Sequence, residues 1–346
     1  MSEGRAGGGA AGRLAADGGA ADEGAAGEQR DGAKLAFVFP GQGSQKVGMG
    51  KDWADAFPTA AAVFVEADHV LGMPLSRLCW VVPAEELQLT ANLQPALLAT
   101  SVAILRVLEE HEVCPAVVAG HSLGEYSALV AAKVLDLPDA LRLVRRRGEL
   151  MQAAVPVGVG AMAAVLGLPP EQVAAAAAEA STGGEICAVA NLNSPEQTVI
   201  AGHKAAVERA IPLLQARGAR RALMLPVSAP FHSPLMRSAR EGLEPDLRAI
   251  EFRDPVMPVV TNVDARPVSG GDAARDALVR QIDSPVRWVE SVTWIAEQAG
   301  VERFVEVGPG SVLCGLIKRI VAGSRPTSCG GPDGLPALMA EARGGG

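Results

Sequence analysis

Aromatic side chains are scarce in this 346-residue sequence, which contains seven Phe, four Trp and one Tyr. Proteins that bind single-stranded nucleic acid stack the bases on aromatic rings. The small number of rings in this chain argues against a base-stacking surface. An excess of basic residues is also missing, because 31 Lys and Arg stand against 39 Asp and Glu. Nucleic-acid-binding proteins present a basic face. The composition therefore excludes nucleic acid as an expected partner.

Cysteines and long apolar runs are also few. No unbroken apolar run reaches about 18 residues, so we expect no transmembrane helix and no membrane partner. The cysteines form no CxxC pair and have no histidine at the spacing of zinc ligands, and no secretory segment is visible. We therefore expect reduced thiols in a cytoplasmic protein without a metal site. The five cysteines are Cys79, Cys114, Cys187, Cys314 and Cys329.

The two ends of the chain differ from its middle. Ten Gly and ten Ala fill 20 of the first 33 positions, and Leu14 is the only large aliphatic residue after Met1. Such a segment has little to bury, so we expect a disordered tail over residues 1–33. Residues 324–346 are again rich in Gly and Pro, and we interpret them as a C-terminal extension in which only Leu335–Ala342 could form a short helix. The whole chain is 49% hydrophobic, which is enough for a large core between the ends.

Short apolar runs alternate with helical stretches over most of the middle. The strand patterns cover 35–39, 116–119, 256–261 and 303–307, and the helical patterns cover 94–111, 125–132, 137–154, 233–250 and 273–281. Apolar strands separated by helices are typical of a parallel sheet with both faces covered. In such sheets the active site lies beyond the carboxyl ends of the strands. We therefore look for chemistry in the turns that follow these strands.

Residues 157–225 break this rhythm. Strand patterns occur at 159–166, 186–191, 197–201 and 221–225, with helical patterns at 169–180 and 205–216. The order β-α-β-β-α-β is typical of a ferredoxin-like domain. The sequence thus predicts a small domain inserted into a larger one that consists of residues 34–156 and 226–323.

The strongest single motif is G-x-S-x-G at residues 120–124, between a strand pattern and a helical pattern. Its two glycines allow a tight strand-to-helix turn that raises the Ser122 hydroxyl at a helix N-terminus, where backbone N–H groups can hold an oxyanion. The strand before the motif and the helix after it are the context that it requires. We predict that Ser122 is a nucleophile on an α/β fold with an α/β-hydrolase-like core.

A serine nucleophile needs a base, and the chain has five histidines. His69 and His111 lie on acidic helical segments, His203 precedes a helix, and His121 is next to the serine and points away from it. His232 remains, in a Pro- and Ser-rich loop just before a helix. We predict that it is the base, with a capping or merely exposed histidine as the alternative.

The third member of a hydrolase triad is not evident. An acid would come between the serine and the histidine in the chain. Asp136, Asp139 and several glutamates fall in that interval, but none follows a strand directly. This weakens the interpretation of the chain as an ordinary hydrolase.

Two further features surround the nucleophile. Arg145, Arg146 and Arg147 are consecutive on an apolar helix and span about 200°, so at least one must face the protein interior. An inward guanidinium needs an anion and matches a carboxylate; a single structural ion pair is the alternative.

Gln42 lies between two glycines after the first strand, where a second oxyanion donor is expected. A phosphate-binding loop is rejected there, because the G-K-[ST] ending is missing.

Taken together, the motifs resemble the malonyl-CoA:acyl-carrier-protein transacylases of fatty-acid and polyketide synthesis. The similarity extends over residues 34–323, and the inserted ferredoxin-like domain is also a feature of that family. The matching segments are FVFPGQGSQ (37–45), LQPALL (93–98), GHSLGEY (120–126), RRRGELMQ (145–152), NLNSPEQTVIAG (191–202), PFHSPLM (230–236) and EVGPGSVLCGL (306–316).

The resemblance implies a Ser–His dyad. Ser122 would become malonyl-serine, His232 would act as base and then acid, and the backbone carbonyl of Gln281 would orient the imidazole. It also implies that the backbone N–H groups of Gln42 and Leu123 form the oxyanion hole. The remaining roles fall to Arg147, which would bind the malonyl carboxylate, and to Gln94 and Asn191, which would line or support the cleft.

The reaction implied is a ping-pong transfer of malonyl from malonyl-CoA to the phosphopantetheine thiol of holo acyl carrier protein, without a cofactor or a metal. Phe231 precedes His232, and in related polyketide acyltransferases a bulky residue there accompanies malonyl rather than methylmalonyl. A family member has a small polar residue at that position, so a trans-acting malonyl acyltransferase of a polyketide synthase stays open. A serine thioesterase or esterase is the more remote alternative, and a non-catalytic binding module is a third.

Charge suggests where the carrier protein docks. Carrier proteins are acidic and this chain carries a formal net charge of −8, so docking requires a local basic patch. Arg220-Arg221 and Lys318-Arg319 are the candidates. We expect a monomer.

Overall fold

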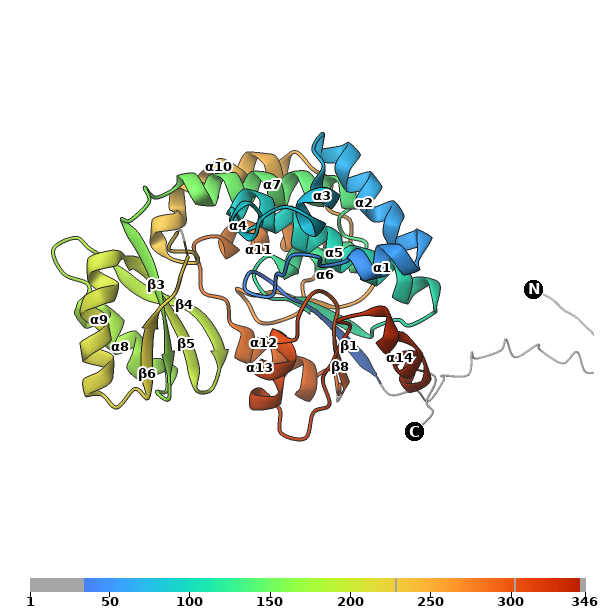
Figure 1. Cartoon of the computed structure of the whole chain (residues 1–346). Helices are drawn as coiled ribbons and strands as arrows, with labels where there is room; N and C mark the ends of the chain where they lie inside the picture. The colour runs from blue at the N-terminus through green and yellow to red at the C-terminus, as the bar shows by residue number, and fades with distance from the viewer. Residues whose placement is uncertain (1–33, 228, 302, 343–346) are drawn as a thin grey trace, which may run out of the picture. The chain divides into compact units, whose positions relative to one another are not determined.

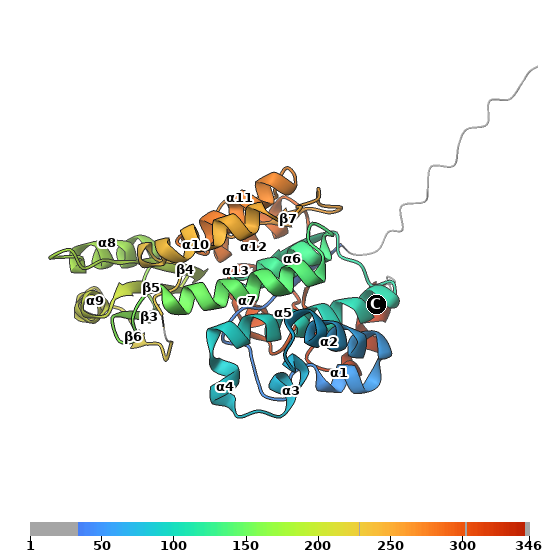
Figure 2. The same ribbon diagram turned by 90° about the horizontal axis from the view of Figure 1, so that it is seen from above.

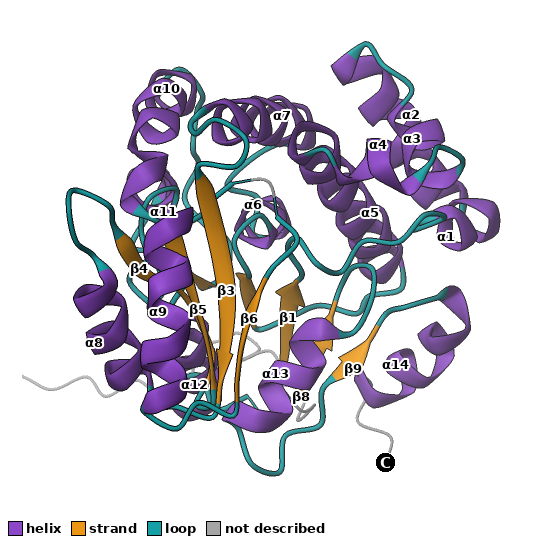
Figure 3. Cartoon of the chain, turned by 60° about the vertical axis from the view of Figure 1, so that its left-hand side comes forward, coloured by secondary structure: helices purple, strands orange, loops and turns teal. Residues whose placement is uncertain are grey.

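Two β-sheets, one parallel and one antiparallel, organise the described part of the chain, which comprises residues 34–227, 229–301 and 303–342 of a computed structural model (Figure 3). The α/β class predicted from the sequence is confirmed by this arrangement. The tail expected over residues 1–33 lies outside the described residues.

The larger sheet has five strands in the order β7-β2-β1-β8-β9, and every neighbouring pair is parallel. β1 matches its predicted range. β7 is shorter than the pattern at 256–261, because Val256 is 67% exposed and Pro258 has no N–H to donate. The strands are β1 (Leu35–Phe39), β2 (Val117–Gly120), β7 (Val259–Val260), β8 (Arg303–Glu306) and β9 (Thr327–Ser328).

Helices cover both faces of this sheet (Figure 1). Those after β1 are α1 (Lys51–Ala56), α2 (Pro58–Leu71), α3 (Leu75–Trp80), α4 (Ala84–Gln88) and α5 (Thr90–Glu110). Those between β2 and β8 are α6 (Gly124–Ala131), α7 (Leu137–Ala153), a short 3-10 turn η1 (Pro234–Met236), α10 (Arg237–Arg248), α11 (Gly271–Gln281) and α12 (Trp288–Glu297). Those after β8 are α13 (Val312–Ile320), the 3-10 turn η2 (Pro332–Gly334) and α14 (Leu335–Ala342).

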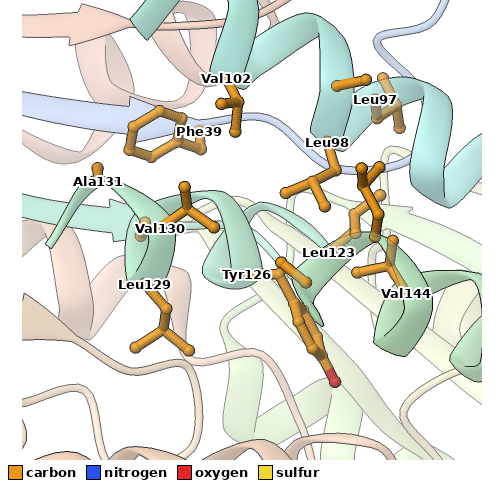
Figure 4. Close-up of a cluster of buried hydrophobic side chains, with 14 of the residues drawn as sticks. Phe39, Leu97, Leu98, Val102, Leu123, Tyr126, Leu129, Val130, Ala131 and Val144 are labelled. Atoms are coloured by element: carbon orange, nitrogen blue, oxygen red, sulfur yellow. The ribbon is translucent and has the colours of Figure 1, made fainter. Parts of the chain in front are cut away.

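The alternation of side chains along β1 divides the core into two layers. Phe37 and Phe39 join the large cluster that includes residues of α2, α5, α6 and α7. Ala36 and Val38 face the opposite way and pack with residues of α12 and α13. A strand that is apolar at every position is therefore buried on both faces. Figure 4 shows Phe39 of β1 with Val102 of α5 and Val130 of α6 in the first layer.

α5 is the longest helix among the described residues, with 21 residues. By length and composition alone it could cross a membrane, but 83% of its apolar window is buried within the protein. It packs against α2, α6 and α7, as the core helix of a folded domain does. Its apolar surface is thus already covered by this chain.

The antiparallel sheet lies between α7 and η1 in the sequence, where the inserted domain was expected. Its order is β4-β5-β3-β6. Two helices cover one face and enclose a separate apolar cluster (Figure 1). The elements are β3 (Gly160–Leu166), α8 (Pro170–Ala180), β4 (Cys187–Ser194), β5 (Gln197–His203), α9 (Lys204–Ala216) and β6 (Arg221–Met224).

Residues 327–339 are part of the body of the protein, although the sequence separated them as an extension. β9 pairs with β8 along the parallel sheet. Leu335 and Leu338 of α14 are buried in the large core cluster. The short helix that the sequence allowed at Leu335–Ala342 is confirmed as α14, whereas its packing into the core was not predicted.

Candidate active site

The site begins at the turn between β2 and α6. Ser122 has a φ of 52°, a left-handed conformation that non-glycine residues adopt only at a cost in energy. Side chains at the flanking glycines have no room, because a Cβ on Gly120 would lie 1.9 Å from the Gly124 carbonyl carbon and one on Gly124 would lie 2.0 Å from the Phe39 oxygen. The motif is thus confirmed as a tight strand-to-helix turn that exposes a strained serine.

Asn262, which follows β7, holds this turn from the side. Its Nδ2 donates to the Gly120 carbonyl at 2.6 Å, and its Oδ1 accepts the Ser122 N–H at 2.7 Å. The two contacts bracket the nucleophile position, and Asn262 is fully buried. Asn262 is not among the residues predicted from the sequence. Its one visible signal was its place just after an apolar strand at the edge where the site was expected.

His232 is hydrogen bonded to Ser122. The distance from Ser122 Oγ to His232 Nε2 is 2.7 Å, and the distance from His232 Nδ1 to the backbone oxygen of Gln281 is 2.9 Å. A carbonyl oxygen only accepts, so Nδ1 carries the proton and Nε2 is free to accept from the serine hydroxyl. The backbone carbonyl occupies the place of the missing triad acid.

The environment of His232 keeps its imidazole neutral. Burial, the positive Arg147 and the nearby His121 together lower its pKa to about 3, against the hydrogen bond to the Gln281 backbone, which raises it. A neutral imidazole can accept a proton throughout the physiological pH range. His232 also has a positive φ of 57°, so both members of the pair are held in left-handed conformations.

One of the three consecutive arginines turns inward, as predicted, and it is Arg147. Its side chain is 1% exposed. Arg145 and Arg146 remain near the surface, where they pair with Glu149 and Asp246. α7, which carries these residues, lies beside α10 (Figure 2).

The hydrogen-bond partners of Arg147 are all neutral. Nη1 donates to Gln94 Oε1 at 2.7 Å, and Nη2 donates to Gln281 Oε1 at 2.9 Å and to Ser122 Oγ at 3.2 Å. Its Nε is buried without a partner. Among the ion pairs of the described residues none involves this arginine. A buried guanidinium that is hydrogen bonded to no carboxylate is costly, so binding of an anionic group at this position would be favourable.

Gln281 connects the parts of the site. Its backbone oxygen accepts from His232, its Oε1 accepts from Arg147, and its Nε2 donates to the Ser122 carbonyl at 2.9 Å. Nε2 also donates to Glu125 Oε2 at 3.0 Å. Five residues that the sequence analysis singled out therefore lie in one continuous hydrogen-bond network. They are Ser122, His232, Arg147, Gln94 and Gln281.

The other predicted residues lie around this network. Gln42 follows β1 and Leu123 begins the turn into α6, and within the described part of the chain neither of their backbone N–H groups has an acceptor. Such free donors at adjacent strand ends suit an oxyanion. Phe231 is 7% exposed and packs in the large core. Asn191 is buried in β4 and forms a bridge with Val286, which ties the antiparallel sheet to the segment before α12.

Glu125 and the His121–Asn193 contact were also missed. Glu125 lies in the first turn of α6 and is fully buried. His121 Nε2 lies 2.8 Å from Asn193 Oδ1, and its ring meets Trp288 edge-on. For Glu125 the available signal was a glutamate in an otherwise apolar first turn of a helix. The His121–Asn193 contact joins residues 72 positions apart, which no local pattern reveals.

No group of three or more His, Cys, Asp or Glu side chains gathers as a metal site would require within the part of the chain that the structure describes. The groups that the site does bring together are a serine hydroxyl, a neutral imidazole hydrogen bonded to it, and a buried arginine whose hydrogen-bond partners are neutral. Such an arrangement can transfer an acyl group that carries a carboxylate.

Comparison with known proteins identifies relatives along nearly the whole chain. A family profile described as "Acyl transferase domain" matches residues 36–328. The malonyl CoA-acyl carrier protein transacylase of Escherichia coli (strain K12) is 52% identical over 307 residues, which cover 88% of this chain and 99% of the relative. That of Bacillus subtilis (strain 168) is 47% identical over 288 residues, which cover 83% of this chain and 90% of the relative.

Solved structures agree. An acyl carrier protein S-malonyltransferase from Vibrio cholerae has 50% sequence identity and a TM-score of 0.85, and the match covers 88% of this chain and 100% of that one. A structure described as a type II PKS acyl-carrier protein in complex with its malonyl-transacylase has 49% identity and a TM-score of 0.85, and covers 90% and 99%. The chain therefore belongs to the acyl transferase family, among the malonyl CoA-acyl carrier protein transacylases.

Proposed function

We propose that this protein transfers the malonyl group of malonyl-CoA to the phosphopantetheine thiol of holo acyl carrier protein, through a malonyl-serine intermediate at Ser122. The observation that carries this proposal is the buried Arg147, which forms no ion pair with any described residue and whose Nη2 donates to the Oγ of Ser122 at 3.2 Å. An acyl group that bears a carboxylate would supply the missing anion beside the nucleophile.

In the first half-reaction, His232 Nε2 takes the Ser122 hydroxyl proton as Oγ attacks the thioester carbonyl carbon. The 2.7 Å contact between them suits this transfer. The carbonyl oxygen becomes an oxyanion that the N–H groups of Gln42 and Leu123 stabilise. The C–S bond then breaks, and His232 returns its proton to the sulfur, so that CoA leaves as a thiol.

The second half-reaction reverses these steps with a different thiol. His232 takes the proton of the phosphopantetheine thiol as the sulfur attacks the serine ester. The ester C–O bond breaks, and the proton goes to Ser122 Oγ. Because one acyl ester replaces another, the reaction is nearly balanced, and the protein contributes chiefly oxyanion stabilisation and exclusion of water.

Arg147 supplies selectivity in this proposal. Gln94 and Gln281 bind two of its nitrogens through neutral amide oxygens, so neither of them supplies an anion to the guanidinium. A malonyl carboxylate neutralises it, whereas an acetyl group leaves a desolvated charge without a partner. Phe231 precedes His232 and is buried, and its bulk favours malonyl over the branched methylmalonyl. Asn191 supports the cleft through the bridge to Val286.

We also propose finer names for the two parts of the fold. The strand order β6-β3-β5-β4, with α8 and α9 on one face, supports a ferredoxin-like domain over residues 157–225. The parallel strands with a nucleophile turn after β2 support an α/β-hydrolase-like core. The bounds of this core are residues 34–156 and 226–323, with β9 and α14 added to it by their packing.

We further propose that the protein acts in the cytoplasm, as a monomer.

The carrier protein docks, in this proposal, at a groove of about 770 Å³ between the antiparallel sheet and α13. Both sequence-predicted basic pairs contribute to it, through Arg220, Arg221 and Arg319. Glu196 is also in the lining and pairs with Arg220, which leaves Arg221 and Arg319 to receive an acidic partner. Reversing the charge of both should raise the apparent KM for carrier protein and leave that for malonyl-CoA unchanged.

A second candidate is supply of a polyketide synthase rather than of fatty-acid synthesis. The observation that favours it is the neighbouring structure described as a type II PKS acyl-carrier protein with its malonyl-transacylase. Comparing kcat/KM for fatty-acid and polyketide carrier proteins distinguishes the two. The esterase alternative is disfavoured, because His232 is oriented by a backbone carbonyl and Arg147 is buried at the nucleophile.

The central test incubates the protein with malonyl-CoA, with and without holo carrier protein, and follows acyl-serine and malonyl-carrier by mass spectrometry. We expect malonyl-Ser122 without the carrier and its consumption when the carrier is added. In Arg147→Ala the preference should move from malonyl-CoA towards acetyl-CoA. Rapid hydrolysis of malonyl-CoA without any malonyl-carrier would overturn the proposal.

A further inference from the structure

Glu125 is a fully buried carboxylate for which the proposed reaction assigns no step. It lies three residues after Ser122, in the first turn of α6. Its Oε2 accepts the Asn262 N–H at 2.9 Å and the Gln281 Nε2 at 3.0 Å, whereas its Oε1 is buried without a partner. A buried carboxyl that is only half satisfied destabilises a fold, so its contacts need another explanation.

The contacts of Glu125 determine how the Gln281 amide is oriented. The Gln281 Nε2 donates to the Ser122 carbonyl at 2.9 Å and to Glu125 Oε2 at 3.0 Å, with Asn262 Oδ1 as a third and longer contact at 3.5 Å. Its Oε1 therefore faces the donor Nη2 of Arg147 at 2.9 Å. The flipped amide would set an oxygen against three oxygens and an NH₂ group against a guanidinium. Without Glu125 one of the two close acceptors that fix this orientation is lost, and the Ser122 carbonyl and the longer Asn262 contact remain.

We propose that Glu125 is a positioning residue that fixes the Gln281 amide and thereby holds Arg147 in place for the substrate carboxylate. This inference rests on the proposed function. Glu125 touches neither Arg147 nor the acyl group in this scheme, and it acts through Gln281. The Asn262 N–H that it also accepts belongs to the residue that brackets Ser122, so one carboxyl serves both the nucleophile turn and the acid-binding arginine.

The geometry separates two consequences of losing this carboxyl. Glu125→Gln keeps an oxygen that can accept from both N–H groups, whereas Glu125→Leu keeps the volume and removes the acceptor. A loss of fold alone would reduce transfer of malonyl and acetyl groups alike. A misplaced Arg147 would reduce the malonyl rate selectively, because only malonyl carries the carboxylate that this arginine binds.

The experiment measures kcat/KM for malonyl-CoA and acetyl-CoA in the wild type, both Glu125 variants, Gln281→Leu and the double variant Glu125→Leu/Gln281→Leu. We expect Glu125→Leu to lower the malonyl-to-acetyl ratio about 10- to 100-fold, the range found when supporting residues around a site are removed. Glu125→Gln should stay within about 3-fold of the wild-type ratio. The double variant should be no worse than Gln281→Leu, because the effect of Glu125 passes through Gln281.

Glu306 provides the matched control. It is also fully buried, and its Oε2 accepts the Cys314 N–H at 2.8 Å at the start of α13, away from Arg147. Glu306→Leu should lower stability and leave the malonyl-to-acetyl ratio unchanged. An unchanged ratio in Glu125→Leu, or additive losses in the double variant, would overturn the proposal.

A structural readout does not depend on turnover. In a crystal structure of Glu125→Leu we expect the Gln281 amide to rotate and the 2.9 Å contact between Arg147 Nη2 and Gln281 Oε1 to be lost. An intact contact there would refute the positioning role even if the wild type transferred no malonyl group. Failure of the wild type to form malonyl-serine would instead count against the proposed function.

Discussion

The end of the parallel sheet that carries Ser122 and the antiparallel sheet with α8 and α9 are built on different principles. The first buries a guanidinium, a carboxyl and an imidazole within one hydrogen-bond network, in Arg147, Glu125 and His232. The second encloses a core of Ala, Val, Leu, Ile and Cys. Among the described residues 160–224, no Asp, Glu, Lys, Arg or His is buried.

The difference shows which region carries strain and desolvation and which carries stability. Ser122 and His232 both have positive φ angles, and Glu125 and Arg147 each retain a buried polar atom without a partner. Such features destabilise a fold and are retained where function requires a preorganised site. In the antiparallel region the charged side chains are exposed or half-buried and pair at the surface, as Arg209 does with Glu185.

The largest effect is expected from Ser122→Ala. Removing the nucleophile should lower the rate of malonyl transfer by about 10⁴-fold or more, because the second thioester can no longer form through an acyl-enzyme. Ser122 is removed without opening a core cavity, so the free energy of unfolding should change by less than about 1 kcal/mol. Quenched-flow acyl-enzyme trapping and urea unfolding measure the two quantities. A large loss of stability in Ser122→Ala would contradict the division, because it would mean that the nucleophile turn also contributes substantially to the stability of the fold.

Ile200→Ala should give the opposite pattern. Ile200 is fully buried in the cluster beneath α8 and α9. Truncation leaves a cavity, and the free energy of unfolding should fall by about 2–5 kcal/mol, with Ile200→Val costing about 0.5–1.5 kcal/mol. Because the residue lies outside the active-site network, kcat/KM of the folded protein at low temperature should stay within about 2-fold. A drop of ten-fold or more would mean that the small sheet sets the geometry of the site.

Glu125 should make stability depend on pH. Burial raises its pKa to about 7 from an ordinary value of 4.5, although Gln281, Asn262 and Arg147 oppose the rise. The folded state therefore binds the proton more tightly than the unfolded chain. Stability from this group is present below about pH 4.5 and is lost as the pH rises through 7, by up to about 3 kcal/mol at 1.36 kcal/mol per pKa unit. Asp264, Arg280 and Tyr126 are the other charged or titratable groups that act on it.

The measurement is urea unfolding of the wild type and Glu125→Gln from pH 4.5 to 8.5. The amide does not titrate, so the variant should gain stability relative to the wild type as the pH rises, mostly between pH 5 and 7. Taking the difference removes the contribution of His232, whose pKa is lowered to about 3 in both proteins. A difference that is constant with pH would show that Glu125 is not a strained, buried acid.

The same contrast explains what could be predicted from the sequence. The antiparallel region was predicted almost element by element, because its strands and helices have strong local periodicity and clear turns. The nucleophile turn and His232 were found because a G-x-S-x-G motif and a count of five histidines are local information. α1, α3 and α4 were not predicted, since each has six residues or fewer and shows too little periodicity, and of α2 only the helical segment around His69 was predicted.

Glu125 and Asn262 could not be predicted in the same way. Their roles arise from contacts between residues 137 to 142 positions apart in the chain. Arg147 was narrowed only to one of three consecutive arginines until a resemblance selected it, because helix geometry requires one inward side chain without naming which. Chain-distant polar networks are therefore the part of a site that local sequence reasoning misses.

The smallest effect is expected at the surface of α9. Lys204 and Glu208 form a pair at 3.8 Å, and both side chains are 54% exposed. Exposed pairs contribute little, and a lysine in the first turn of a helix faces the positive end of the helix dipole. Lys204→Ala should therefore change the free energy of unfolding by no more than about 0.5 kcal/mol, with little dependence on salt. A loss above 1 kcal/mol in urea unfolding would show that surface charges, as well as the apolar cluster, hold this region together.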